Sequence, residues 1–186
     1  VKSEPGKVFN YQSCDTQLLS MILEKATGKP LSEYASEKLW KPLGAEHPAL
    51  WCLDHEGGRE KAYCCFNSTA TDFARIGQMV LDSGQFNNRQ VVSKTYLKEA
   101  TTPASWLLGE DGKPLDYYGY QFWMLTHQDH KVVYARGILG QYIFVIPSLN
   151  AVVVRLGNER SKEYVNNVPK DILTYLDAAF EMLTQK

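Results

Sequence analysis

The sequence carries almost no net charge and no long hydrophobic run. Its 20 Lys and Arg residues balance 21 Asp and Glu residues, which leaves a formal net charge of −1. Such a balance gives no electrostatic reason to expect nucleic acid or an anionic membrane as a partner. The apolar runs are far shorter than the ~20 residues that a membrane-spanning helix needs. We therefore expect no nucleic-acid partner and no membrane span.

Cysteine is scarce, and its four positions follow no ordered pattern. Residues 14, 52, 64 and 65 lack the spacing of a small disulfide framework. Cys52-x-x-His55, near the adjacent pair Cys64 and Cys65, could contribute to a zinc site, although neighbouring cysteines rarely both ligate one metal. Buried free thiols are the interpretation that we favour. We expect no metal and no cofactor, and the cysteines leave the redox compartment open.

The hydrophobic pattern changes its period near residue 116. With 186 residues, 44% of them apolar, the chain can bury one sizeable core. Residues 1–115 show mainly helical spacing, whereas residues 116–186 show antiparallel strands followed by a C-terminal helix, all in one domain. The expected helices start near Ser13, Pro30, Thr69, Ser93 and Pro169, and the expected strands are Ala49–Leu53, Ala62–Phe66, Tyr117–Leu125, Val132–Ala135, Gln141–Ile146 and Ala151–Leu156. This order indicates an α+β fold, an antiparallel sheet covered by helices.

Two of the helix starts have recognisable signals. Ser13 is a candidate cap for the first helix, and Thr69 and Asp72 form a capping-box pattern at the third. Leu18, Leu19, Ile22, Leu23 and Ala26 form an apolar face at helical spacing on the first helix.

The stretch Tyr134–Gly157 is the expected centre of the fold. Gln141–Ile146 and Ala151–Leu156 flank turn residues and predict a hairpin. Because Ala151 to Val154 is apolar without alternation, we expect this strand to be central and covered on both faces. Gly137 and Gly140 precede the hairpin and could aim backbone N–H groups at an oxyanion. On spacing alone, a bulge or tight turn is the interpretation that we favour.

Tyr11 lies just before the first helix and has two interpretations. A buried structural tyrosine is the commoner case. The alternative is a phenolate general base beside a nucleophile, which would need a nearby cation because the pKa of a free phenol is ~10. The residues themselves leave this choice open.

Several blocks of the sequence resemble one family when they are taken in order. They are Phe9-x-Tyr11-x-Ser13, Leu39-Trp-Lys-Pro-Leu-Gly44, Asn67-Ser-Thr-Ala-Thr-Asp72 and Gly137-x-x-Gly140-Gln141. This set resembles serine hydrolases of the class C β-lactamase type, a group with penicillin-binding proteins, family VIII esterases and nylon-oligomer hydrolases. The resemblance covers nearly the whole chain. It implies a β-lactamase/transpeptidase-like fold.

The resemblance also implies a mechanism and site residues. In this family a serine of a Ser-x-x-Lys motif attacks an acyl carbonyl, and a lysine and the motif tyrosine manage its proton. Tyr11 matches that tyrosine, and the backbone at Gly140 and Gln141 matches one half of the oxyanion hole. The matching substrate-binding positions are Ser13, Leu139 and Tyr142. The family's Lys-Thr-Gly is replaced by Ile138-Leu139-Gly140, which fits an ester, amide or peptide substrate better than a β-lactam.

The chain lacks the family's nucleophile motif. No serine is followed by a lysine three positions later, and no Gly-x-Ser-x-Gly is present. We therefore expect a domain incomplete at its N-terminus and inactive in acyl transfer as this chain alone. One sheet edge and one helix face should be bare, and the chain should be able to self-associate through the bare sheet edge. By resemblance, the protein is periplasmic or secreted.

Two hypotheses of different classes follow. In the first, the intact protein is a serine hydrolase that acts on a small-molecule ester, amide or peptide substrate. In the second, it is a catalytically inactive binding domain for peptide or glycan. A Ser-x-x-Lys motif elsewhere in the protein would favour the first hypothesis.

Overall fold

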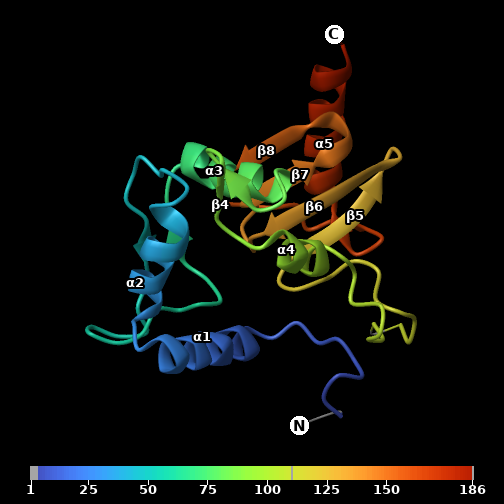
Figure 1. Cartoon of the computed structure of the whole chain (residues 1–186). Helices are drawn as coiled ribbons and strands as arrows, with labels where there is room; N and C mark the ends of the chain where they lie inside the picture. Colours follow the sequence, from blue (N-terminus) through green and yellow to red (C-terminus); the bar gives the residue numbers. More distant parts are fainter. Residues whose placement is uncertain (1–3, 110, 186) are drawn as a thin grey trace.

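The computed structural model describes residues 4–109 and 111–185. Residues 1–3 and 110 of the predicted helical region, and residue 186, lie outside the described part. Helices and antiparallel strands are both present, and the strands form one larger sheet with three two-stranded ribbons (Figure 1). The predicted α+β class is confirmed.

The larger sheet contains four antiparallel strands in the order β5-β6-β7-β8. They are β5 (Trp123–His127), β6 (His130–Arg136), β7 (Tyr142–Ile146) and β8 (Ala151–Arg155). All four predicted strands exist, although β5 begins six residues later than expected because the chain before it forms turns. The register pairs Arg136 with Tyr142, and Tyr142 with Arg155, which places these three residues at one end of the sheet.

The expectation that Ala151–Val154 forms a central strand was wrong. Within the described residues, β8 is an edge strand, β6 and β7 are the inner strands, and β7 is largely buried. The valines of β8 are half-buried because helices cover both faces of the sheet, while one backbone edge of the strand has no neighbour among the described strands. A continuous apolar run indicates that both faces of a strand are buried, but it does not indicate whether both backbone edges pair with other strands.

Helices α3 (Ala70–Leu81) and α5 (Lys170–Thr184) lie on opposite faces of the sheet (Figure 1). Ile172, Leu176 and Phe180 of α5 form the main core cluster with Tyr134, Tyr142, Phe144 and other residues of the sheet. On the other face, α3 approaches β7 and β8 through Gly77, where an added Cβ would lie 2.4 Å from Val152 Cγ1. The helix and sheet therefore need a glycine at this crossing.

The remaining elements are short. They are α2 (Leu31–Ala35), a π-helical turn (Ser36–Trp40), β1 (Leu50–Trp51), β2 (Phe66–Asn67), β3 (Gln85–Phe86), β4 (Arg89–Gln90), α4 (Lys94–Ala100), β9 (Tyr164–Val165) and β10 (Val168–Pro169). β1 pairs with β2 in the region where a two-stranded unit was predicted. Among the described residues no helix is both long and apolar enough to cross a bilayer.

Helix α1 (Ser13–Thr27) runs along the edge of the molecule (Figure 1), and the expectation that Ser13 caps it was wrong. Its N-cap residue is Gln12, which makes no side-chain capping bond, and Ser13 is the first helical residue. Leu18, Leu19 and Ile22, on the apolar face of α1, are 57%, 54% and 56% exposed. Self-association through bare apolar surface or a sheet edge stays a prediction.

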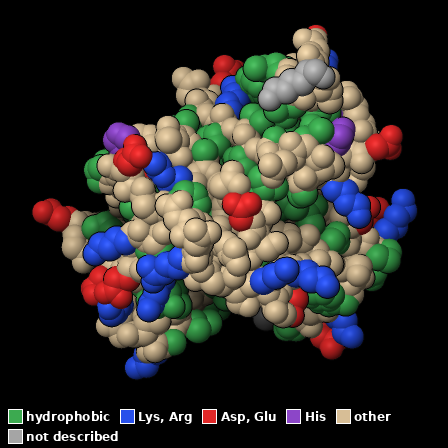
Figure 2. Space-filling view, turned by 45° about the horizontal axis from the view of Figure 1, so that its top comes forward, with side chains coloured by type: hydrophobic (Ala, Val, Ile, Leu, Met, Phe, Trp, Pro, Cys, Tyr) green, Lys and Arg blue, Asp and Glu red, His purple; other side chains and the backbone are tan. Residues whose placement is uncertain are grey.

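Basic and acidic side chains lie intermingled on the face of the molecule drawn in Figure 2. Hydrophobic side chains show between them. This mixed surface agrees with the near-zero net charge of the sequence.

Candidate functional site

The turn between β6 and β7, residues 137–141, is closed by its own backbone. The Gly137 N–H donates to the Gln141 carbonyl at 2.7 Å, and the Gly140 N–H donates to the Gly137 carbonyl at 3.2 Å. Gly140 has φ +81°, in the left-handed region that glycine favours. The side chains of Ile138 and Leu139 are 75% and 51% exposed at the tip of the turn.

The Gln141 side chain holds the turn from inside. Its carboxamide oxygen accepts a 3.3 Å hydrogen bond from the Leu139 N–H, and its Nε2 donates to the Gly157 carbonyl beyond β8. Within residues 4–109 and 111–185, the backbone N–H of Gln141 has no hydrogen-bond acceptor. A fixed turn with an unused N–H is the geometry that an oxyanion donor requires.

Gln141 also lines a hollow of about 510 Å³. The hollow lies between the start of α3 and the segment that follows β8, and its lining includes Phe66, Phe73 and Leu156 together with Asn67, Ser68, Gly157 and Asn158. Polar and apolar groups are thus mixed at its wall. The volume suits a small organic ligand.

Tyr11 is held at the same end of the sheet by aromatic contacts. Its ring lies 5.4 Å from the Trp123 ring and edge-on at 5.9 Å to the Tyr118 ring. Trp123 begins β5, and the guanidinium of Arg136, at the end of β6, lies 4.0 Å from the centre of its ring. Arg136 directly precedes the turn at Gly137. A chain of contacts therefore links Tyr11 to the turn.

Tyr11 itself is 56% exposed, so the commoner interpretation of a buried structural tyrosine does not hold. Its neighbour Tyr118 is buried and donates to the side chain of Gln121 at 3.2 Å. Burial raises the pKa of Tyr118, and the nearby Tyr11 adds to this effect. Because Tyr118 is buried and Tyr11 is exposed, Tyr11 is the accessible phenol of the pair.

The other predicted substrate-binding positions differ in their access. Ser13 is exposed at the first turn of α1, and Leu139 is exposed on the turn at the end of β6. Tyr142 is buried, and its hydroxyl donates to the Asp171 carboxylate at 3.0 Å. Burial and this bond raise the pKa of Tyr142. Its side chain belongs to the core, so it offers no surface to a substrate.

A buried carboxylate supports the wall of the hollow. Asp72, in the first turn of α3, accepts hydrogen bonds from the backbone N–H groups of Glu46 and His47 and from the hydroxyl of Thr69, and it pairs with Arg75 at 2.6 Å. Thr69 caps α3 as predicted, but Asp72 turns to the 46–47 loop instead of completing a capping box. Burial opposes ionisation of Asp72, but these hydrogen bonds outweigh it and lower its pKa to about 2.

The expectation of buried free thiols was wrong. Cys64 and Cys65 form a disulfide between adjacent residues, and Cys65 has φ +68°. Cys14 and Cys52 are free and exposed. The disulfide directly precedes Phe66, which lines the hollow. Among the described residues, no group of three possible metal ligands is found.

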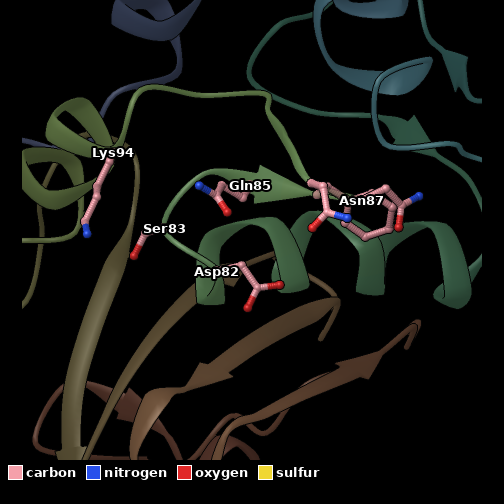
Figure 3. A pocket seen from close by; sticks show the side chains of 7 residues that line it. Asp82, Ser83, Gln85, Asn87 and Lys94 are labelled. Atoms are coloured by element: carbon pink, nitrogen blue, oxygen red, sulfur yellow. The ribbon is translucent and has the colours of Figure 1, made fainter.

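A second hollow of about 570 Å³ lies at the β3–β4 hairpin (Figure 3). Asp82, Ser83 and Gln85 contribute polar groups, and Lys94 reaches it from the start of α4. This hollow shares no lining residue with the first.

The charged residues around the turn were not predicted from the sequence. Arg136 and Arg155 each end a strand, and both contact aromatic rings. A single charge at the end of the apolar run Ala-Val-Val-Val was the signal that could have drawn attention to Arg155.

Comparisons with known proteins show the family and the fold of the chain. The family model described as "Beta-lactamase" matches residues 1–174. The 6-aminohexanoate-dimer hydrolase of Paenarthrobacter ureafaciens is 31% identical over 155 residues, which cover 81% of this chain and 39% of the relative. The chain thus spans about two fifths of the length of this curated relative.

Solved structures show the same fold. One named "Putative 6-aminohexanoate-dimer hydrolase from Bacillus anthracis" is 27% identical, with a TM-score of 0.82 over 98% of this chain and 45% of that one. A structure from Bacteroides dorei, named as a "putative beta-lactamase", is 16% identical with a TM-score of 0.79, over 98% of this chain and 60% of that one. The predicted β-lactamase/transpeptidase-like fold is confirmed, and the chain forms part of the domain.

Proposed function

Because the chain belongs to the β-lactamase family, we propose that the intact protein is a serine hydrolase that cleaves an ester or amide bond through an acyl-enzyme. The observation that carries this proposal is the unused N–H of Gln141 on a fixed turn, within the described residues and beside a hollow. An N–H in that position can bind the negative charge that develops on a carbonyl oxygen. The accessible phenol of Tyr11 at the same end of the sheet supports it.

The proposed reaction has two steps. A serine hydroxyl from polypeptide outside this chain attacks the carbonyl carbon, the phenolate form of Tyr11 takes the serine proton, and the Gln141 N–H binds the oxyanion. The Tyr11 hydroxyl then donates this proton to the leaving alcohol or amine as the bond to the carbonyl carbon breaks, which leaves the acyl-enzyme. Water then attacks the acyl-enzyme by the reverse proton path, which releases the acid.

A linear amide is the substrate class that we favour. Ile138 and Leu139 are exposed at the tip of the turn. A cation at this position would favour binding of the carboxylate of a β-lactam, but both of these side chains are apolar. An apolar tip suits an uncharged or aliphatic acyl chain. The relative from Paenarthrobacter is named for hydrolysis of a 6-aminohexanoate dimer, and this dimer is therefore the first compound to test.

Hydrolysis assays on the intact protein test the proposal. We expect release of product from the 6-aminohexanoate dimer or from a p-nitrophenyl ester, with slower cleavage of a chromogenic cephalosporin. The chain of residues 1–186 alone is expected to hydrolyse none of them. Labelling of that chain by a fluorophosphonate would show that it carries its own nucleophile. Absence of a Ser-x-x-Lys motif from the rest of the protein would favour the alternative, a binding domain for peptide or glycan.

We also propose that the protein is exported to the periplasm or secreted. The Cys64–Cys65 disulfide supports this proposal, since disulfides persist mainly in oxidising compartments. Fractionation of cells that express the intact protein tests it.

A further inference from the structure

We propose that Arg155 is a positioning residue, which fixes and polarises the peptide group that carries the Gln141 N–H. This inference rests on the proposed function, because it assigns that N–H to the oxyanion. Arg155 would raise the rate of the chemical step without touching the substrate.

The geometry follows from the peptide bond itself. The Arg155 guanidinium donates a 2.6 Å hydrogen bond to the carbonyl oxygen of Gly140. That carbonyl and the N–H of Gln141 belong to one peptide group, and the described chain has no cis peptide bond. In a trans peptide the C=O and N–H point in opposite directions. Arg155 therefore binds the carbonyl side of this peptide group, and the N–H of Gln141 points away from Arg155.

The charge on Arg155 also affects the strength of the donor. A hydrogen bond from a charged donor to a carbonyl is roughly twice as strong as a neutral one. It draws electron density toward the carbonyl oxygen, and linked hydrogen bonds strengthen one another by about 10–30% per bond. The N–H of Gln141 thus becomes a better donor to an oxyanion.

Arg155 is held firmly enough to act as a positioning group. The same guanidinium nitrogen donates to the Glu159 carbonyl at 3.0 Å. The guanidinium lies 4.8 Å from the Tyr175 ring centre and 3.8 Å from the Asp171 carboxylate, both on α5. Its side chain is 24% exposed. Contacts from the turn, the segment after β8 and α5 therefore converge on it.

Two glycines give the guanidinium the space that it occupies. A Cβ at Gly140 would lie 1.9 Å from a guanidinium nitrogen of Arg155, and a Cβ at Gly157 would lie 2.4 Å from the same atom. Any larger residue at either position would displace the arginine. Gly140 and Gly157 are thus matched to Arg155.

Lysine is a poor substitute at this position. Arginine is planar and presents several donors in a fixed fork, whereas lysine offers one compact charge on a flexible stem. A lysine could restore charge near the Gly140 carbonyl without the fixed direction. Arg155→Lys and Arg155→Met therefore separate loss of geometry from loss of charge.

The experiment compares these two variants, made in the intact protein, with a control variant. The control is Arg89→Met, which removes an exposed arginine on β4. Turnover of a p-nitrophenyl ester gives kcat and KM, and thermal unfolding reports folding. For Arg155→Met we expect kcat to fall ~10–100-fold, less than loss of an oxyanion donor itself, with KM changed less than about threefold. The kcat of Arg155→Lys should lie between the values for Arg155→Met and the wild type. The kcat of Arg89→Met should equal that of the wild type.

A second measurement keeps the inference testable whatever the activity. In amide NMR spectra of the intact protein, Arg155→Lys should shift the Gln141 N–H resonance upfield, as expected for a weaker polarisation, while resonances in α1 stay unchanged. An unchanged kcat in folded Arg155→Met, or an unchanged Gln141 resonance, would overturn the inference. If the wild type hydrolyses nothing, the proposed function fails, while the amide shift still decides whether Arg155 polarises this peptide.

Discussion

The ring of Tyr11 lies 5.4 Å from the ring of Trp123, although the two residues are 112 positions apart in the sequence. Trp123 lies at the start of β5 and is in turn covered by Arg136, one residue before the turn of residues 137–141. These contacts bring the phenol and the glycine-flanked turn to one end of the sheet. A catalytic role for both depends on that arrangement.

Tyr11→Phe in the intact protein should lower turnover by ~10²-fold or more, since it removes the group that accepts the serine proton. The ring contacts with Trp123 and Tyr118 need no hydroxyl, so thermal stability should stay the same. Tyr96→Phe is the matched control, because that tyrosine is 52% exposed on α4. Wild-type turnover in Tyr11→Phe would remove this phenol from the mechanism.

Gly77→Ala should destabilise the protein by ~1–3 kcal/mol through overpacking. The added methyl would lie 2.4 Å from Val152 Cγ1 and 3.0 Å from Ile143 Cγ2, so α3 has to move away from the sheet. Chemical denaturation measures the loss, with Thr71→Ala on the exposed side of α3 as the control. A variant as stable as the wild type would mean that the crossing is looser than the structure shows.

Asp72→Asn should cost about 3 kcal/mol at neutral pH, because it breaks a buried ion pair and its hydrogen bonds. The pKa of Asp72 is lowered to about 2 in the folded protein. Its stabilisation is therefore complete above the ordinary aspartate pKa of ~3.9 and is lost as the pH falls toward 2. The difference in unfolding free energy between variant and wild type should shrink between pH 5 and pH 2.

Unfolding at several pH values checks this prediction. Asp111→Asn, which changes an exposed carboxylate, should show no such dependence. A difference that stays constant from pH 5 to pH 2 would contradict the lowered pKa.

Without reductant, only Cys14 and Cys52 should react with iodoacetamide, because Cys64 and Cys65 are joined. Reduction before alkylation should raise the number of labelled cysteines from two to four, which mass spectrometry reads directly. The indole of Trp51 donates to the Cys64 carbonyl at 3.0 Å, so its fluorescence should change on reduction. Four labelled cysteines in the unreduced, folded protein would exclude the disulfide.

Much of the fold could be predicted from local pattern. The strands β6, β7 and β8, helix α3 and helix α5 follow from period and turn residues, since each has one face that must be buried. The edge position of β8 could not be predicted in this way. The hydrophobic pattern of a sequence predicts which side chains favour burial, but it does not identify the element that packs against them.

Part of the candidate site could likewise be predicted from local sequence motifs, and part could not. Tyr11 and the turn at Gly140 were found through the resemblance of short motifs. Arg155 was not found, because its bond to the Gly140 carbonyl joins a side chain to a backbone atom 15 positions away. Such a contact leaves no spacing rule in the sequence. The Cys64–Cys65 disulfide was missed for a similar reason, since it depends on a left-handed backbone at Cys65.

The most direct measurement is a structure of the intact protein after reaction with a phosphonate ester, a stable mimic of the tetrahedral intermediate. We expect phosphorus bonded to a serine, one phosphonyl oxygen within about 2.7–3.1 Å of the Gln141 nitrogen, and the Tyr11 hydroxyl beside the serine oxygen. A phosphonyl oxygen bound away from Gln141, or a protein that forms no adduct, would contradict the account.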